Sequence, residues 1–239
     1  MTGVQTCALP IYIDTSGTAS GLKSKDIVDN AVLEIIEKNE MLLFWYLKKG
    51  YYINKTELLM KMINNIGFSS EQIEIFYSRE LTNNHVFIVI LISQGKIVAS
   101  GAGINKDSLK SLKKALLEAR LLEWLNKNNP LSTMSKLDEK EQQNTINYVE
   151  LLKQDLPHKD FKRTVEKHTV FEEWIKSMDV HVLNKRNNNT SLTIKCISKD
   201  LYNCLPLKKN IKDDLNKKIA TIYGLEKYVL ENTPDCILL

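Results

Sequence analysis

The spacing of apolar positions divides the chain into helices and strands. A helix of about six turns is predicted from Lys25 to Tyr46, with Ser24 as its N-cap. A second helical pattern covers Tyr51 to Ile66 and ends at Gly67. Further helices are predicted over 107–126, 138–156, 164–178 and 210–223, the first of them capped by Asn105 or Asp107. The apolar faces expected to point inward are Leu58, Leu59, Met62 and Ile63, then Leu109, Leu112, Leu116, Leu117, Leu121 and Trp124, and finally Phe171, Trp174 and Ile175.

Apolar runs with strand character lie between these helices. Strands are predicted over 73–77, 85–93 and 96–104, and a hairpin over 180–183 and 192–197 joined by 187–189. The run from His85 to Ser93 is apolar almost throughout, which is typical of a strand buried on both faces. Helices and strands together predict an α+β fold with a mixed sheet and long packed helices.

The first helix carries the most informative pattern of charge. It follows a segment of small residues, Thr15 to Gly21, that is expected to form a tight loop. Its polar sector then runs toward Met41 and Phe44, where the helix becomes apolar all the way round. The residues of that sector are Asp26, Asn30, Glu34 and Glu37. Carboxylates one turn apart at the mouth of a buried region favour a hard cation or a phosphate-bound metal, and a solvated helix face is the alternative.

Composition indicates a globular chain in a reducing compartment. Hydrophobic residues make up 43% of the sequence, enough for a sizeable core. The net charge of +4 comes from lysines that alternate with acidic residues, which argues against a nucleic-acid-binding module and leaves that class third. No apolar run approaches the roughly 18 residues of a membrane span. Cys196, Cys204 and Cys236 form no C-x-x-C pair, so a cytoplasmic protein without disulfides is expected.

Residues 1–11 are interpreted as a translated sequencing-library adapter and are set aside from the fold. The natural reading frame would then enter near Tyr12, and upstream sequence would be missing; a genuine N-terminus is the alternative. Within 12–239, the expected divisions are 12–129, 130–163 and 164–239, with the clearest break in the polar stretch from Asn126 to Lys136.

Two motifs resemble the YcaO family. The first is the loop Thr-x-Gly-x-Ala-x-Gly of residues 15–21, followed by Glu34-x-x-Glu37, a basic Lys38 and an aromatic run. The second is Ala-Leu-x-Glu at 115–118, which keeps Glu118 but has Leu121 where the family has glutamine. Other positions also depart from the family pattern: Leu22 replaces a nucleotide-binding asparagine, Asp26 a glutamate and Lys38 an arginine.

The resemblance implies an ATP and magnesium site. In that family ATP phosphorylates a peptide amide oxygen while a Cys, Ser or Thr side chain attacks the carbonyl, and the oxygen leaves as phosphate. Glu34 and Glu37 would hold Mg²⁺, and no side chain of the chain itself is assigned a catalytic role. The residues expected to bind ATP are Ser16, Gly17, Asp26, Lys38 and Glu118. Glu118 could instead be an exposed residue that pairs with Lys114 one turn earlier.

The resulting hypothesis is a YcaO-like domain, incomplete at its N-terminus, from an ATP-dependent cyclodehydratase. The family's other metal-binding helix, Ser-x-x-x-Glu-x-x-Glu, has no copy in this sequence, so the fragment alone is expected to be inactive. The resemblance implies azoline formation in ribosomally made peptides of the microcin or bacteriocin type. The expected partners are a precursor peptide and a leader-binding protein, and a homodimer is compatible with the prediction. Neither nucleic acid nor a membrane is expected as a partner. A degenerate, non-catalytic scaffold that docks a partner enzyme or precursor peptide is the alternative.

Overall fold

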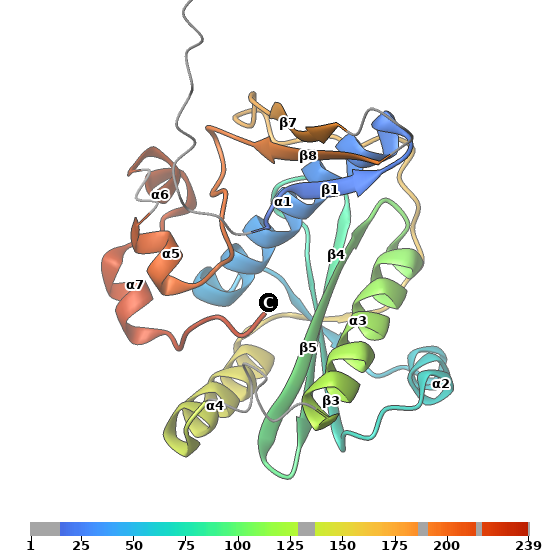
Figure 1. Cartoon of the computed structure of the whole chain (residues 1–239). Helices are drawn as coiled ribbons and strands as arrows, with labels where there is room; N and C mark the ends of the chain where they lie inside the picture. The colour runs from blue at the N-terminus through green and yellow to red at the C-terminus, as the bar shows by residue number, and fades with distance from the viewer. Residues whose placement is uncertain (1–14, 129–136, 186–190, 214–216, 239) are drawn as a thin grey trace, which may run out of the picture.

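The computed structural model describes residues 15–128, 137–185, 191–213 and 217–238 (Figure 1). Its helices are α1 Ser24–Leu47, α2 Glu57–Ile66, α3 Ser108–Asn128, α4 Glu139–Asp155, α5 Lys208–Asp213, α6 Lys217–Tyr223 and α7 Lys227–Asn232. Its strands are β1 Thr18–Gly21, β2 Tyr51–Asn54, β3 Gln72–Ser78, β4 His85–Ser93, β5 Lys96–Asn105, β6 His158–Asp160, β7 Asp179–Lys185 and β8 Leu192–Ile197. No helix in these ranges has the length and apolar character to cross a membrane.

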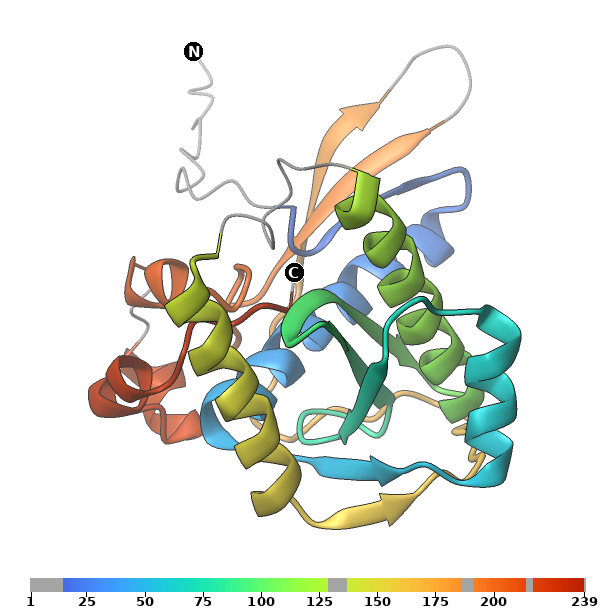
Figure 2. The same cartoon turned by 90° about the horizontal axis from the view of Figure 1, so that it is seen from below.

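A five-stranded mixed sheet forms the centre of the fold. Its order is β5-β4-β3-β2-β6, and all neighbours are antiparallel except the parallel pair β2 and β6. Figure 2 shows α2 and α3 along one side of this sheet and α1 and α4 on the other. Along β4, Val86 and Ile88 pack into the core on the α1 side, whereas Phe87 and Val89 pack toward α2 and α3. The predicted α+β class and the strand buried on both faces are therefore confirmed.

Helix α1 lies between this sheet and a second, three-stranded one (Figure 1). The smaller sheet has the order β1-β8-β7, so it joins the start of the described chain to its predicted hairpin. Ile194 and Cys196 of β8 belong to the same core as Ile35 and Ile36 of α1. From Ile35 to Tyr46 every residue of α1 is buried, so burial begins before the apolar run that starts at Met41. The helix is thus fixed from both sides.

Helix α3 approaches β5 closely because glycines leave room for it. A Cβ atom at Gly101 would lie 2.4 Å from both the Ala115 carbonyl oxygen and the Ala119 nitrogen. At Gly103 it would lie 2.3 Å from the Ser111 carbonyl oxygen. Any larger residue would push α3 away from the sheet. This close packing sets the position of every side chain that α3 presents toward α1.

The helix ends follow the sequence in part. Ser24 is the first residue of α1 and not its cap; Lys23 occupies the cap position and makes no side-chain cap hydrogen bond. Of the two candidates before α3, Asp107 is correct, since its Oδ1 accepts a hydrogen bond from the Leu109 nitrogen at 3.0 Å. Asp138 caps α4 with a full capping box, in agreement with the predicted start of that helix.

Three stretches differ from the predicted elements. The helix expected over 51–66 begins as strand β2 and becomes helical only at Glu57, and the expected loop over 15–21 contains strand β1. The helix expected over 164–178 is wrong. That segment runs beside the loops at 81–83 and 106–108, and its backbone hydrogen bonds to Leu81, Asn83 and Ser108 replace those of a helix. The side chains expected to point inward there, Phe171, Trp174 and Ile175, still pack partly buried against the α1 core.

The C-terminal part contains more short elements than the pattern predicts. The helix expected over 210–223 is described as α5 and α6, with 214–216 outside the described residues, and it ends before Gly224 as expected. Strand β6 and helix α7 were not predicted. The hairpin turn at 187–189 and most of the polar break at 126–136 lie outside the described residues.

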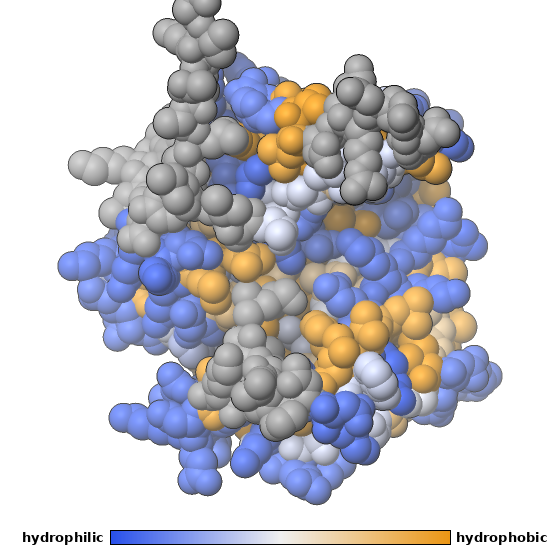
Figure 3. Space-filling view, viewed as in Figure 1, coloured by the Kyte–Doolittle hydropathy of each residue, from blue (hydrophilic) through white to orange (hydrophobic). Residues whose placement is uncertain are grey.

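The outer face of α3 is the main error in the predicted core. Leu112 and Leu116 are buried as expected, but Leu117, Leu121 and Trp124 are exposed to 48%, 56% and 55%. Hydrophobic side chains gather over this helix in the space-filling view (Figure 3). The glycines of β5 bring the side of α3 that carries alanine against the sheet, so its leucine-rich flank turns outward. On α2, similarly, Leu59 and Ile63 are buried while Leu58 is exposed.

Candidate functional site

The acidic sector of α1 does enter the interior. Asp26 is exposed, Glu34 is half-buried and Glu37 is only 4% exposed. Lys38, the next residue, is 8% exposed. The gradient arises because α1 starts at the surface and is buried without interruption from Ile35 to Tyr46. Of the two interpretations left open by the sequence, a solvated helix face therefore does not describe Glu37.

Helix α3 brings two charged side chains against this part of α1. The Lys114 ammonium lies 2.9 Å from Glu37 Oε2. Glu118 Oε2 accepts a hydrogen bond from the Ala102 backbone nitrogen of β5 at 3.0 Å. Glu118 is thus not a freely exposed residue paired with Lys114; Lys114 pairs with Glu37 instead. We call Glu34, Glu37, Lys38, Lys114 and Glu118 the charged cluster.

The charges of this cluster act on one another. Burial raises the pKa of Glu118, and the neighbouring Glu37 carboxylate raises it further, while Lys38 and Lys114 act in the opposite direction. Burial by itself would lower the pKa of Lys114, but the carboxylates of Glu37, Glu118 and Glu34 outweigh it, so the pKa of Lys114 is raised. Three carboxylates therefore face two lysines, so the surroundings of the cluster stabilise a positively charged group.

The small-residue loop packs against the same helix. Gly17 has φ of 72°, and its carbonyl oxygen accepts a hydrogen bond from the Cys196 nitrogen at 2.8 Å. A Cβ atom there would lie 2.7 Å from Ile35 Cγ1, so only glycine allows this approach. Ser16 beside it is buried. The loop that carries Ser16 and Gly17 therefore packs against α1 at Ile35, the residue after Glu34.

Asp26 is not brought into the charged cluster. It lies in the first turn of α1, about 12 Å along the helix axis from Glu34 at 1.5 Å per residue. Within the described ranges no hydrogen bond or ion pair links it to Glu37, Lys114 or Glu118. Leu22, where the resemblance leads us to expect a nucleotide-binding asparagine, is 78% exposed.

The cluster has the donors that magnesium prefers, but few of them. No group of three or more His, Cys, Asp or Glu side chains suited to a metal exists among the described residues. Mg²⁺ commonly takes one or two protein carboxylates and completes its shell with water and phosphate oxygens, so Glu34 and Glu37 would suffice. The Lys114 ammonium already shows that Glu37 accepts a cation at this position. The residues present therefore fit the ion that the resemblance implies.

Two roles were missed in the sequence. Lys114 is the partner of Glu37, but the two are 77 positions apart, and no local pattern connects them. Glu40 is fully buried, and it accepts hydrogen bonds from Ser78 Oγ at 2.5 Å and from the Glu80 and Leu81 nitrogens at 2.8 and 2.6 Å. Its position directly before the apolar run of α1 was the available signal for a buried carboxylate.

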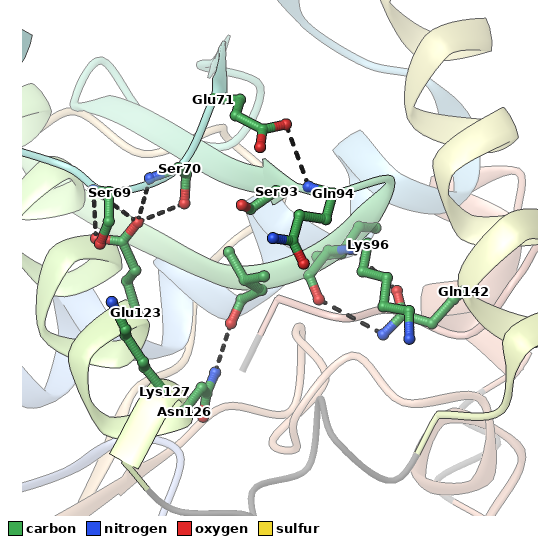
Figure 4. A pocket seen from close by; sticks show the side chains of 12 residues that line it. Ser69, Ser70, Glu71, Ser93, Gln94, Lys96, Glu123, Asn126, Lys127 and Gln142 are labelled. Carbon is green, nitrogen blue, oxygen red and sulfur yellow. Dashed lines mark hydrogen bonds between the residues drawn. The ribbon is translucent and has the colours of Figure 1, made fainter.

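A separate polar pocket of about 480 Å³ lies at the far end of α3 (Figure 4). Its buried acid, Glu123, accepts hydrogen bonds from the backbone nitrogens of Ser69 and Ser70 and pairs with Arg120 at 2.7 Å. These contacts tie α3 to the loop between α2 and β3, and they satisfy the carboxylate. The pocket shares no residue with the charged cluster, and its contacts are structural.

The architecture is that of the YcaO-like fold. The solved YcaO from Methanopyrus kandleri bound with AMPPCP and Mg²⁺ matches with a TM-score of 0.66 over 82% of this chain and 57% of its own, at 12% identity. The Escherichia coli microcin synthetase McbBCD complex matches with a TM-score of 0.56 over 79% of this chain and 55% of its own, at 17% identity. The heterocyclase TruD matches with a TM-score of 0.55 over 92% of this chain and 34% of its own, at 12% identity.

These likenesses concern the fold. At 12 to 17% identity they do not transfer a substrate or a cofactor. The chain spans 57% of the Methanopyrus kandleri protein and less of the others. No family model and no curated protein matches the sequence. The expected YcaO-like α+β fold is confirmed, and the site residues stay predictions.

Proposed function

We propose that this chain contributes the α1 and α3 side of an ATP site in a YcaO-type cyclodehydratase, which activates backbone amides of a ribosomal precursor peptide. The observation that carries the proposal is the meeting of buried Glu37 with Lys114 and Glu118 of α3, beside half-buried Glu34. This meeting of carboxylates and lysines supports the proposal, because Glu34, Glu37 and Lys38 are the residues that the resemblance assigns to metal and phosphate binding.

Each side chain would act by binding and orientation. Glu34 and Glu37 would hold Mg²⁺, which neutralises and aligns the phosphoryl group when bound. Lys38 has its charge buried on α1 and would contact a phosphate oxygen as a single donor. Glu118, held by the Ala102 nitrogen, would accept from a polar group of the nucleotide. Ser16 and Gly17 would line the site from the loop, whereas Asp26 would need a ligand that extends along α1.

Titration of AMPPCP with and without Mg²⁺ tests this proposal. In the Glu37→Gln variant the magnesium-dependent part of the affinity should vanish, because the amide cannot hold the ion as a carboxylate does. Glu173→Gln is the matched control, since Glu173 is exposed and distant in sequence. Nucleotide binding that is identical with and without Mg²⁺, or unaltered by Glu37→Gln, would contradict the proposed site.

A non-catalytic scaffold is the second candidate. It is favoured by Leu22 and Leu121, which stand at nucleotide-binding positions of the family and are 78% and 56% exposed. A scaffold would bind a precursor peptide or a partner enzyme but no AMPPCP at millimolar concentration. We assign the cytoplasm, a precursor peptide and a leader-binding protein to both candidates. Because the partners are shared, the AMPPCP titration separates the two candidates.

A further inference from the structure

The Glu37 and Lys114 pair is strongly asymmetric. The Glu37 side chain is 5% exposed and belongs to a stretch of α1 that is buried between two sheets. The Lys114 side chain is 53% exposed and stands on the outer part of α3. The carboxylate therefore cannot turn to solvent, whereas the flexible four-carbon stem of the lysine allows its ammonium to leave.

Space for such a movement exists beside the pair. A surface groove of about 550 Å³ runs along α3 next to the cluster. Its lining residues are Lys110, Lys113, Lys114, Leu117, Glu118 and Leu121. Lys114 can thus move along its own helix without displacing the core.

We propose that Lys114 is a tethered counter-ion of Glu37 that competes with a divalent cation for this carboxylate, and that it is released toward the accompanying anion when the metal binds. The inference rests on the proposed function, because it assumes that Glu37 is a metal ligand. It adds a role for a residue outside the family motif. The ammonium satisfies Glu37 while the site is empty, and a buried carboxylate without a cation would be costly. Metal and nucleotide binding should then reinforce each other, since the released ammonium gains a phosphate partner.

Titration of the chain with Mn²⁺ alone, followed by electron paramagnetic resonance, measures this competition directly. In Lys114→Met the Mn²⁺ affinity should rise at least about tenfold, which is the effect of a competing charge 2.9 Å away even at the dielectric constant of bulk water. Lys113→Met is the matched control: it removes the same charge from the same groove, but among the described residues Lys113 forms no ion pair with Glu37. Lys114→Arg keeps the charge and should bind Mn²⁺ like the wild type.

A second titration, with AMPPCP at saturating Mn²⁺, tests the release of Lys114. Lys114→Met should lose at least about fivefold in AMPPCP affinity while it gains in metal affinity, a combination that a loss of folding cannot produce. Circular dichroism of each variant verifies the fold. In a Glu37→Gln background the Lys114→Met substitution should no longer change Mn²⁺ binding.

The outcomes separate the two proposals. Equal Mn²⁺ affinity in wild type and Lys114→Met overturns the tethered counter-ion but leaves the proposed function intact. A similar gain in Lys113→Met also overturns it, because the effect would then be general electrostatics. Absence of Mn²⁺ binding in wild type and in Lys114→Met overturns both the counter-ion and the metal part of the proposed function.

Discussion

Replacing Glu40 by glutamine should remove the part of the pH dependence of the unfolding free energy that comes from the titration of this carboxyl group. Glu40 is fully buried in α1, and burial raises its pKa from 4.5 to about 7, although hydrogen bonds from Ser78, Leu81 and Glu80 oppose the shift. The folded chain therefore holds a proton on Glu40 between pH 4.5 and 7 that the unfolded chain releases. The stabilising contribution is complete below pH 4.5 and is lost as the pH rises through 7.

The magnitude follows from the shift. A change from 4.5 to about 7 at 1.36 kcal/mol per pKa unit corresponds to about 3 kcal/mol of unfolding free energy. Glutamine imitates the protonated acid: its oxygen can accept from the nitrogens of Glu80 and Leu81, and its amide can donate to the rotated hydroxyl of Ser78. Glu40→Gln should thus match the wild type near pH 4.5 and exceed it by about 3 kcal/mol above pH 8.

Urea unfolding followed by circular dichroism from pH 4.5 to 8.5 measures this difference. Subtracting the curves of wild type and Glu40→Gln cancels the titration of all other groups. The exposed Glu173→Gln variant should show no such difference. A constant offset between wild type and Glu40→Gln across this range would refute the reasoning. So would a variant that is less stable at every pH, because its hydrogen bonds would then not be equivalent.

Two further substitutions test how α3 and the C-terminal segment are held. Gly101→Ala should lower the unfolding free energy by about 3 kcal/mol, since the added methyl would lie 2.4 Å from the Ala115 oxygen, and a shift of urea midpoint checks it. Asn39→Ala should lower the unfolding free energy by about 3 kcal/mol and make proteolytic cleavage of the C-terminal segment faster. Asn39 is buried, and its Oδ1 accepts hydrogen bonds from the Tyr202 nitrogen and the Tyr223 hydroxyl. Its Nδ2 donates to the Tyr202 carbonyl oxygen.

Matched variants control both experiments. Gly21→Ala adds a methyl group that meets only the flexible Ile27 side chain, at 3.1 Å, and should change the midpoint little. Asn232→Ala removes an exposed amide that bonds only within α7 and should leave cleavage unaltered. If Gly101→Ala unfolds like wild type, α3 does not pack on β5 as closely as described. Equal cleavage of Asn39→Ala and wild type would show that other contacts hold the segment.

Sequence patterns correctly predicted the elements that are determined by residues within their own segment. Strand β4 is apolar on both faces and helix α1 is apolar around its last turns, so burial could be inferred from each segment alone. The same holds for the predicted start of α4 at 138, where the structure has a capping box that lies within four residues. For Glu37, the helix pattern left burial and a solvated face open, and the structure shows burial.

The errors arose where distant segments decide the structure. The stretch over 164–178 has helical spacing, but its backbone groups pair with loops some 60 to 90 positions away, and that pairing is invisible in the local pattern. The outward turn of Leu121 depends on Gly101 and Gly103 in another strand. The partner of Glu37 required knowing how α1 and α3 meet. Local periodicity could predict a site on α1 but could not complete it.

The sandwiching of α1 between two sheets has a consequence for the order of folding. The three-stranded sheet that covers α1 is completed only when β1 pairs with β8. That pairing joins residues such as Ser20 and Thr193, which are 173 positions apart. The far end of α1 is covered by the last residues, since Cys236 donates to the Tyr46 hydroxyl. During synthesis this side of the apolar end of α1 therefore stays exposed until the segment around Cys236 has emerged. We expect slow, highly non-local folding and a nascent chain that engages chaperones through α1.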